Sequence, residues 1–347
     1  MRYKLFGHSG LRVSEIALGT MTFGQEWGFG TDAQSCGQIL GAYEEAGGNF
    51  IDTANKYTNG SSEAILGDLL EGGRRDRFVL ATKYSLSMRS GDPNACGNQR
   101  KNMVQSVEAS LKRLKTDHID LYWVHAWDFL TPVEEVMRGL DDLVRAGKIL
   151  YVGVSDAPAW IVSQANTLAS LRGWTPFIGL QIQYSLLERT VERDLLPMAR
   201  AFDIAVCAWA PIGAGVLAGK YTRDADTGDS LRAQLNARRL TDANLKIARE
   251  VDAVADELGA SSSQVAIAWT MHQHPQIIPI VGSRKLEQIT DCLGAAGLTL
   301  APAHLERLDA VSRVELGFPH DFLATPNIQD IVYGDRRHLI DFPPRSR

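Results

Sequence analysis

The sequence has few cysteines, and none of them form a pair. The four are far apart and no C-x-x-C motif occurs: they are Cys36, Cys96, Cys207 and Cys292. Structural zinc sites and disulfide frameworks both use cysteines at short, regular spacings. We therefore predict neither kind of site and expect the reducing environment of the cytoplasm.

Long apolar runs and an excess of one charge are also absent. No segment has the length needed to cross a bilayer, and residues 1–19 lack the charged start and apolar stretch of a secretory signal. The 41 acidic and 36 basic residues give a formal net charge of −5, so no strong field attracts nucleic acid or an anionic membrane. With 45% hydrophobic residues, the composition is that of a globular protein with a large core.

Two nucleotide-binding motifs and one metal motif are missing. No G-x-G-x-x-G follows a strand-like segment, so a Rossmann dinucleotide site is not supported. Residues 213–221 resemble a P-loop, but no glycine lies five positions before Gly219, and Tyr221 replaces the hydroxyl residue that binds magnesium. His272 and His274 precede a strand-like segment and have no acidic residue close in sequence, so a metal-dependent hydrolase is not favoured.

What the sequence does contain is a regular alternation of strand-like and helix-like segments. Eight short apolar segments occur, at 16–19, 50–54, 78–83, 119–125, 149–155, 177–183, 204–210 and 277–283. Amphipathic stretches lie between them, for example at 101–115 and 261–273. This order implies parallel strands with right-handed crossovers. Eight such units predict an α/β fold, a (β/α)8 TIM barrel, with an open doubly wound sheet as the alternative.

Four additions to the repeat are expected within a single domain of residues 1–347. Residues 3–6 and 11–16 form a β-hairpin, 212–240 are a long glycine-rich connection, and 241–258 add a helix before the seventh regular helix. After a helix at 302–313, a C-terminal tail at 318–347 contains aromatic residues that we expect to cover the barrel mouth. A frayed terminus accounts equally well for the last six residues.

Polar residues at the ends of three consecutive strands form the candidate catalytic group: Asp52, Tyr57, Lys83 and His125. A barrel brings the carboxyl ends of its strands to one rim. Reduction of a carbonyl needs a proton donor, and a free phenol with a pKa of about 10 is a reluctant one. Lys83 is expected to lower the pKa of Tyr57, Asp52 to hold Lys83 charged, and His125 to orient the carbonyl or share the proton relay. Each residue also has a purely structural explanation when it is taken alone. Asp52 and Lys83 would then be a structural ion pair, His125 a core histidine and Tyr57 an ordinary loop aromatic.

These residues lie in motifs that resemble the aldo-keto reductase family. The main one is DTANKYTNGSSE at 52–63, followed by ATK at 81–83, LYWVH at 121–125 and GVS at 153–155. The resemblance covers about residues 3–300, and FPHDF near the end resembles the aryl-alcohol dehydrogenase branch, where we expect the bacterial members to be most similar. It implies a catalytic tetrad of Asp52, Tyr57, Lys83 and His125, with Tyr57 as general acid and hydride supplied by bound NADPH.

The resemblance also implies where the cofactor binds. Ser155, Asp156 and Gln181 would hold the carboxamide, and Trp209 would stack on the nicotinamide unless it simply packs in the core. Further cofactor contacts are expected from Gly19, Thr20, Met21, Asp52, Ala210, Pro211, Ile212, Gly213, Lys220, Gly282, Ser283, Arg284, Gln288 and Asp291. Residues 282–285 open a helix, which suits the 2'-phosphate of NADP and favours NADPH over NADH. Asp156, Asp291 and Cys292 depart from the family's usual asparagine and Glu-Asn pair.

An aromatic wall is the basis for the substrate prediction. Trp27, Trp127 and either Phe318 or Phe322 are expected to line the pocket beside Tyr57 and His125, which favours flat aromatic aldehydes and ketones. The rival function is a non-catalytic, cofactor-binding subunit that resembles channel β-subunits. Those relatives typically carry another residue in place of His125, so the complete tetrad favours an enzyme. The physiological substrate, the direction of reaction and the oligomeric state are not predicted.

Overall fold

Eight parallel strands form a closed barrel in the computed structural model, which describes residues 1–223 and 237–341. In barrel order they are β3 (Ala17–Gly19), β4 (Phe50–Asp52), β5 (Val79–Tyr84), β6 (Ile119–Val124), β7 (Ile149–Ser155), β8 (Phe177–Gln183), β9 (Ala205–Trp209) and β10 (Ile277–Gly282). β10 pairs with β9 and also with β3, where Ile280 lies opposite Ala17. This last pairing closes the barrel, so the predicted (β/α)8 fold is confirmed and the open sheet is excluded.

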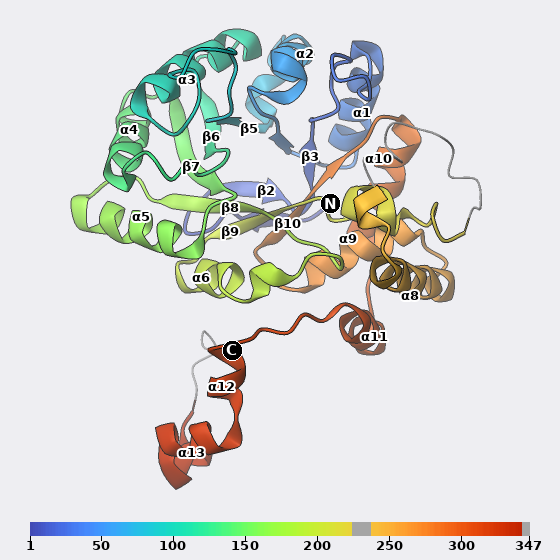
Figure 1. Ribbon diagram of the computed structural model, residues 1–347. Coiled ribbons are helices and arrows are strands. Elements are labelled where there is room, and N and C mark those ends of the chain that lie inside the picture. Colours follow the sequence, from blue (N-terminus) through green and yellow to red (C-terminus); the bar gives the residue numbers. More distant parts are fainter. Residues whose placement is uncertain (224–236, 342–347) are drawn as a thin grey trace.

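Helices surround the barrel (Figure 1). They are α1 (Ala33–Glu45), α2 (Ser61–Leu69), α3 (Arg100–Leu114), α4 (Val133–Arg145), α5 (Ala159–Arg172), α6 (Leu195–Ala201), α8 (Asp242–Leu258), α9 (Ser262–His272), α10 (Leu286–Leu293) and α11 (Pro302–Ser312). Short 3-10 turns are η1 (Tyr57–Gly60), η2 (Arg75–Arg77), η3 (Thr190–Glu192), η4 (Gly213–Ala218), η5 (Ala237–Arg239), η6 (Gly294–Gly297) and η7 (Gly334–Leu339).

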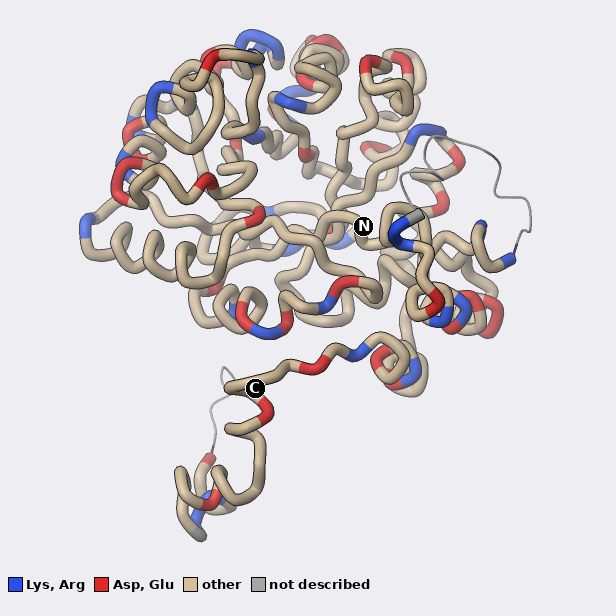
Figure 2. The backbone as a smooth tube through the Cα atoms, viewed as in Figure 1, with Lys and Arg blue, Asp and Glu red and all other residues tan. Residues whose placement is uncertain are grey.

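Apolar spacing and capping explain why these segments are helical. In α4, Val136, Met137 and Leu140 are buried at intervals of three and four residues, so one face packs on the barrel. The side chains of Asp32 and Ser261 accept hydrogen bonds from the first turns of α1 and α9. Lys, Arg, Asp and Glu are interspersed over the outer helices (Figure 2). No helix in the described ranges has both the length and the apolar character needed to cross a bilayer.

The predicted N-terminal hairpin is present as β1 (Tyr3–Leu5) and β2 (Arg12–Ser14), which pair antiparallel. Phe6 follows β1 and packs inside the barrel against Phe50 and Trp123, with ring centroids 5.5 and 6.3 Å away. The Trp123 ring occupies the space that a Cβ atom at Gly153 would need. Large side chains therefore fill the barrel interior near the N-terminal hairpin. A binding site can form only at the opposite end, where the carboxyl ends of the strands lie.

The predicted extra helix is confirmed as α8, which contacts α9, α11 and η4. It follows the long connection after β9, of which residues 224–236 lie outside the described residues. The first part of this connection turns sharply, since Ala214 and Gly215 both have positive φ, 56° and 95°. The Arg223 guanidinium then donates to the Asp252 carbonyl and forms an ion pair with Asp256, which ties the connection to α8.

The described part of the C-terminal tail, residues 318–341, does not cover the barrel mouth, and this part of the prediction is wrong. The last six residues, 342–347, lie outside the described residues. Its helices α12 (His320–Ala324) and α13 (Pro326–Tyr333) lie apart from the barrel, below it in Figure 1. Phe318 is 84% exposed and Phe322 is 48% exposed. The reason is the direction of the chain after α11: the Arg193 guanidinium donates to the Glu315 carbonyl beside η3 and α6, and the chain continues away from the rim.

Candidate active site

A cavity of about 550 Å³ lies at the carboxyl ends of the barrel strands. Sixteen of the residues predicted to form the site line it: Gly19, Met21, Trp27, Asp52, Tyr57, His125, Ser155, Asp156, Gln181, Trp209, Ala210, Pro211, Ile212, Gly282, Ser283 and Arg284. They come from seven of the eight strand ends, which meet here because the strands are parallel and closed into a barrel. The site therefore assembles residues that are more than 200 positions apart in the sequence.

Lys83 is at the centre of the predicted tetrad. It lies at the end of β5, its side chain is fully buried, and its ammonium makes three hydrogen bonds. Nζ donates to Asp52 Oδ2 at 2.5 Å, to the Thr53 carbonyl oxygen at 2.8 Å and to Tyr57 Oη at 3.0 Å. All three ammonium protons have acceptors, so the buried charge is compensated.

Asp52 is itself held from the other side of the barrel. The Gln181 amide donates from Nε2 to Asp52 Oδ1 at 2.9 Å, while Oδ2 accepts from Lys83. Because both Asp52 oxygens are engaged, the carboxylate has one fixed orientation. This interaction also commits the Gln181 NH2 group and leaves its carbonyl oxygen to accept a hydrogen bond from a ligand in the cavity.

The pKa values of Tyr57 and Lys83 are both raised. Burial is the main cause for Tyr57, and the Lys83 ammonium lowers its pKa by less than burial raises it. The predicted lowering effect of Lys83 is present, but desolvation outweighs the nearby charge, so the pKa of Tyr57 is not lowered overall. For Lys83, burial favours loss of the proton, but Asp52 and Tyr57 outweigh it and the pKa is raised. The pair is thus a protonated phenol beside a charged ammonium.

His125 faces Tyr57 at the end of β6, with ring centroids 5.8 Å apart and planes at 84°. Burial, with a contribution from the Lys83 charge, lowers the pKa of His125 to about 3. Its Nδ1 is buried and has no hydrogen-bond partner among the described residues. A neutral imidazole can offer a hydrogen bond to a carbonyl oxygen but stores no extra proton near neutral pH. Of the two predicted roles, the geometry favours orientation of the carbonyl over a proton relay.

Trp209, at the end of β9, lines the cavity and is only half buried, so it does not simply pack in the core. Its indole Nε1 donates to Asp156 Oδ1 at 3.1 Å. Ser155 and Asp156, at the end of β7, line the same wall as Gln181. This wall presents an aromatic face, a hydroxyl and an amide carbonyl oxygen side by side.

Two arginine side chains are part of the cavity lining. Arg284 lies where β10 ends, and Arg239 comes from η5. The Ser283 hydroxyl and Arg284 Nε are buried and have no hydrogen-bond partner among the residues the structure describes. Two cations and two unused hydrogen-bonding groups fit an anionic group such as a phosphate.

Some predicted residues do not line the cavity, although several support it. The Thr20 hydroxyl is buried and donates to the Asp52 carbonyl oxygen. Gln288 Oε1 accepts from the backbone N–H of Arg284, and Asp291 accepts from Ser261 and Gln264 near the start of α9. Gly213 and Lys220, which lie in the long connection after β9, are not among the residues that line the cavity.

Trp127 is a clear departure from the prediction. It is buried in the main core cluster and does not line the cavity. The Asp128 carboxylate turns the loop after β6 by accepting from the backbone N–H groups of Asn98, Leu130 and Thr131. Trp127 thereby points into the core, and the structure does not support its predicted contact with substrate. Trp27 does line the cavity, with its ring centroid 6.4 Å from that of Tyr57.

Several lining residues were not predicted: Thr22, Lys56, Leu86, Ala214, Arg239, Ile267, Ile280 and Val281. Ile280 and Val281 belong to a strand that was predicted, so their inward position follows once the barrel is closed. Lys56 lies between Asp52 and Tyr57 in the signature motif, which was a usable signal. Arg239 lies near the end of the long connection, in η5, and no sequence pattern marks it as a cavity residue.

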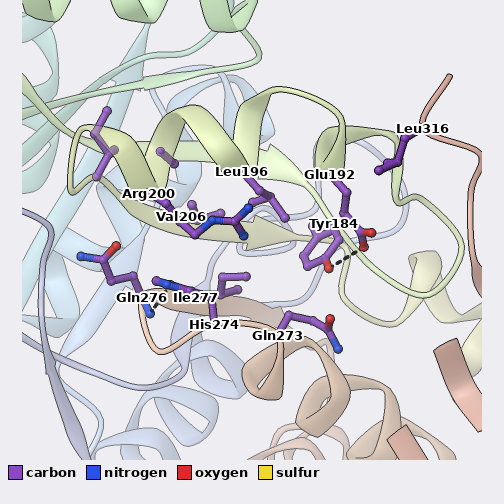
Figure 3. Close-up of a pocket in the computed structure, with 12 residues that line it drawn as sticks. Tyr184, Glu192, Leu196, Arg200, Val206, Gln273, His274, Gln276, Ile277 and Leu316 are labelled. Carbon is purple, nitrogen blue, oxygen red and sulfur yellow. Dashed lines mark hydrogen bonds between the residues drawn. The ribbon is translucent and has the colours of Figure 1, made fainter. Parts of the chain in front are cut away.

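A second cavity, of about 200 Å³, lies away from the tetrad, between α6 and the first residues of β9 and β10 (Figure 3). The Tyr184 hydroxyl donates to the Glu192 carboxylate, which also pairs with Arg189. These polar groups are engaged with one another and hold η3 in place. Among the described residues, no three or more His, Cys, Asp or Glu side chains group closely enough to hold a metal ion.

The model of the Aldo/keto reductase family matches residues 15–313, most of the chain. The chain belongs to this family. It is an oxidoreductase with the family's barrel, and Asp52, Lys56 and Tyr57 from the motif at 52–63 line the cavity described above.

Curated relatives cover nearly the whole chain. An aryl-alcohol dehydrogenase [NADP(+)] of Phanerodontia chrysosporium is 38% identical over 97% of this chain and 92% of its own length. A norsolorinic acid reductase of Aspergillus flavus is 38% identical over 92% and 83%. A putative aryl-alcohol dehydrogenase of Saccharomyces cerevisiae is 36% identical over 91% and 87%. The predicted similarity to aryl-alcohol dehydrogenases is confirmed, but these relatives are fungal, so the expected bacterial branch is not supported.

Proposed function

We propose that this aldo/keto reductase uses NADPH to reduce aldehydes and ketones, preferentially aromatic ones, with Tyr57 as the proton donor. The observation that carries the proposal is the buried Asp52–Lys83–Tyr57 chain of hydrogen bonds at the base of the cavity. NADPH, when bound, supplies a hydride to the carbonyl carbon. The protein supplies the proton and a site for the negative charge that develops on oxygen.

The roles of the tetrad follow from its charges. Tyr57 holds a proton on Oη, because burial keeps the phenol neutral. As this proton moves to the substrate oxygen, the Lys83 ammonium 3.0 Å away stabilises the phenolate that forms. Asp52 keeps Lys83 charged and in place. Neutral His125, next to Tyr57, donates a hydrogen bond to the carbonyl oxygen and fixes its position.

The cavity wall suits the nicotinamide end of the cofactor. The Gln181 carbonyl oxygen is left to accept from the carboxamide NH2, since its own NH2 group donates to Asp52. The Ser155 hydroxyl can donate to the carboxamide oxygen, and Trp209 offers a flat face for the ring. Together they orient the ring toward Tyr57 and His125, which line the same cavity.

The preference for NADPH over NADH rests on the cationic part of the cavity. Arg284 lies there with the unused Ser283 hydroxyl, and Arg239 is a second arginine in the cavity lining. A 2'-phosphate adds negative charge and acceptor oxygens, which NADH lacks and which arginine binds well. The Phanerodontia chrysosporium relative carries NADP(+) in its name, which supports the same choice.

Aromatic substrates are proposed from the lining near Tyr57. The Trp27 ring stands edge to face with Tyr57, and Met21 and Leu86 add apolar surface. A flat aryl group beside these side chains loses little conformational freedom on binding. Two of the relatives named above are an aryl-alcohol dehydrogenase and a norsolorinic acid reductase, which supports an aryl carbonyl compound. We further propose that residues 1–347 act as one domain, with 318–347 as its tail, in the cytoplasm.

The test is a titration of the purified protein with NADPH and with NADH, followed by addition of aromatic and aliphatic aldehydes. We expect NADPH to bind more tightly than NADH, and we expect its near-ultraviolet absorbance to be lost as it is oxidised, faster with aromatic than with aliphatic aldehydes. Tight binding of NADPH without turnover of any aldehyde or ketone would instead indicate a cofactor-binding subunit without catalysis. Equal rates for aromatic and aliphatic aldehydes would contradict the proposed preference for aromatic substrates but not the proposed reductase activity.

A further inference from the structure

Asp156 occupies a fixed position at the cavity wall. It follows directly after β7 with φ of 46°, in the left-handed region that aspartate and asparagine tolerate better than most residues. Its backbone N–H donates to the Gln181 carbonyl oxygen at 3.1 Å, and its own carbonyl accepts from the Trp127 N–H at 3.5 Å. Hydrogen bonds to the end of β8 and to the loop after β6 therefore fix the backbone position of Asp156, and with it the position of its Cβ atom.

The carboxylate of Asp156 is turned toward Trp209. Oδ1 accepts from the indole Nε1 at 3.1 Å, and both side chains line the cavity. Solvent reaches Asp156 through the open cavity, although surrounding protein is close enough that burial raises its pKa, against the Trp209 hydrogen bond and the Lys83 charge. Asp156 takes part in no salt bridge within residues 1–223 and 237–341, so its negative charge has no direct counterion there.

The cofactor proposed above differs in charge between its two redox states. The oxidised nicotinamide ring carries a positive charge and the reduced ring carries none, while the rest of the molecule keeps the same charge. An asparagine at this position would form the same hydrogen bond with Trp209 but would be neutral. A carboxylate at the edge of the aromatic face therefore distinguishes the two ring states by charge. Displacement of water by the bound ring strengthens this effect.

We infer that Asp156 is a specificity residue that shifts binding toward NADP+ relative to NADPH, through attraction between its carboxylate and the cationic ring. The inference rests on the proposed function, since it takes the nicotinamide to lie against Trp209. Relative to an amide at the same position, we expect the carboxylate to favour the oxidised form by about tenfold, the effect of one unit charge at a partly solvated site.

The test is the ratio of the dissociation constants of NADP+ and NADPH, measured by titration calorimetry in wild type and in Asp156→Asn. The matched control is Asp203→Asn, because Asp203 also has a positive φ, 54°, but lies at the amino end of β9 beside His8 and Gln276. We expect Asp156→Asn to weaken NADP+ relative to NADPH by about tenfold and Asp203→Asn to leave the ratio unchanged. An equal change for both forms in Asp156→Asn, or no change, would overturn the inference.

A second variant separates charge from positioning. Trp209→Phe keeps an aromatic face and the Asp156 carboxylate but removes the indole N–H. We expect both cofactor forms to bind less tightly while NADP+ keeps its advantage; a ratio equal to that of Asp156→Asn would show that the hydrogen bond, and not the charge, is responsible. Wild type that binds neither cofactor form would refute the proposed function itself, whereas wild type that binds both with an unaltered ratio in Asp156→Asn refutes this inference alone.

Discussion

The Lys83 ammonium lies 2.5 Å from the Asp52 carboxylate in the fully buried base of the cavity. A buried ion pair stabilises a protein only weakly as a whole, but removal of one partner leaves the other charge unpaired and costs much more. The catalytic arrangement and the stability of the barrel therefore depend on the same contact, and a pair of variants can separate the two effects.

Lys83→Met should lower both stability and turnover. We expect the free energy of unfolding to fall by about 3–5 kcal/mol, because Asp52 is left buried without its partner. The double variant Lys83→Met with Asp52→Asn should recover part of this loss, since no charge remains, but should stay inactive. Urea unfolding and turnover with one aromatic aldehyde measure the two effects. Recovery of turnover in the double variant would contradict the role assigned to Lys83.

The pH profile of carbonyl reduction should have a single limb, on the alkaline side. Tyr57 must be protonated to donate, and its pKa is raised, so activity is retained until the pH exceeds the ordinary phenol value of about 10. His125, with a pKa lowered to about 3, stays neutral and adds no acid limb near its usual 6.5. Measurement of kcat/KM for one aldehyde across this range tests both statements. A fall in activity below about pH 6.5 that disappears in His125→Gln would show that the histidine titrates in the working range.

Removal of the tail should leave catalysis intact. None of the lining residues of the cavity comes from the described part of the chain after Arg284. A truncation after Leu316 keeps the Arg189 contacts to Asp309 and Ser312 and the Arg193 contacts to Glu315. We expect kcat/KM within about twofold of the full chain, the scale of effects away from a site. A large rise in KM for aromatic aldehydes would instead place the tail at the substrate.

The strand-end residues could be predicted from sequence, and the loop residues could not. Asp52, Lys83 and His125 end short apolar segments, and the order of those segments alone brings their ends to one rim. Trp127 lies only two residues beyond His125, yet its direction depends on hydrogen bonds between Asp128 and the loop at Asn98, which no periodic pattern reveals. Arg239 likewise reaches the cavity through the course of a long connection.

The pKa of Tyr57 shows a different limit. The sequence predicts the Lys83 charge beside it, and that contact is present at 3.0 Å. How deeply the phenol is buried depends on the packing of the whole rim, including Trp27 and His125, and burial is the larger influence. The sequence thus predicted correctly that Lys83 contacts Tyr57, but not that burial raises the pKa of Tyr57 by more than Lys83 lowers it.

The most direct test of the account compares Tyr57→Phe with wild type, with Tyr151→Phe as a control that also lacks a hydroxyl but lies outside the cavity lining. Single-turnover reduction of an aromatic aldehyde and the dissociation constant of NADPH are measured on all three proteins. We predict that Tyr57→Phe reduces the rate by about 10²–10⁴-fold, the usual contribution of a general acid, while NADPH affinity stays near that of wild type and Tyr151→Phe behaves as wild type. A Tyr57→Phe protein that binds NADPH and reduces the aldehyde at the wild-type rate would contradict the assignment of Tyr57 as the proton donor.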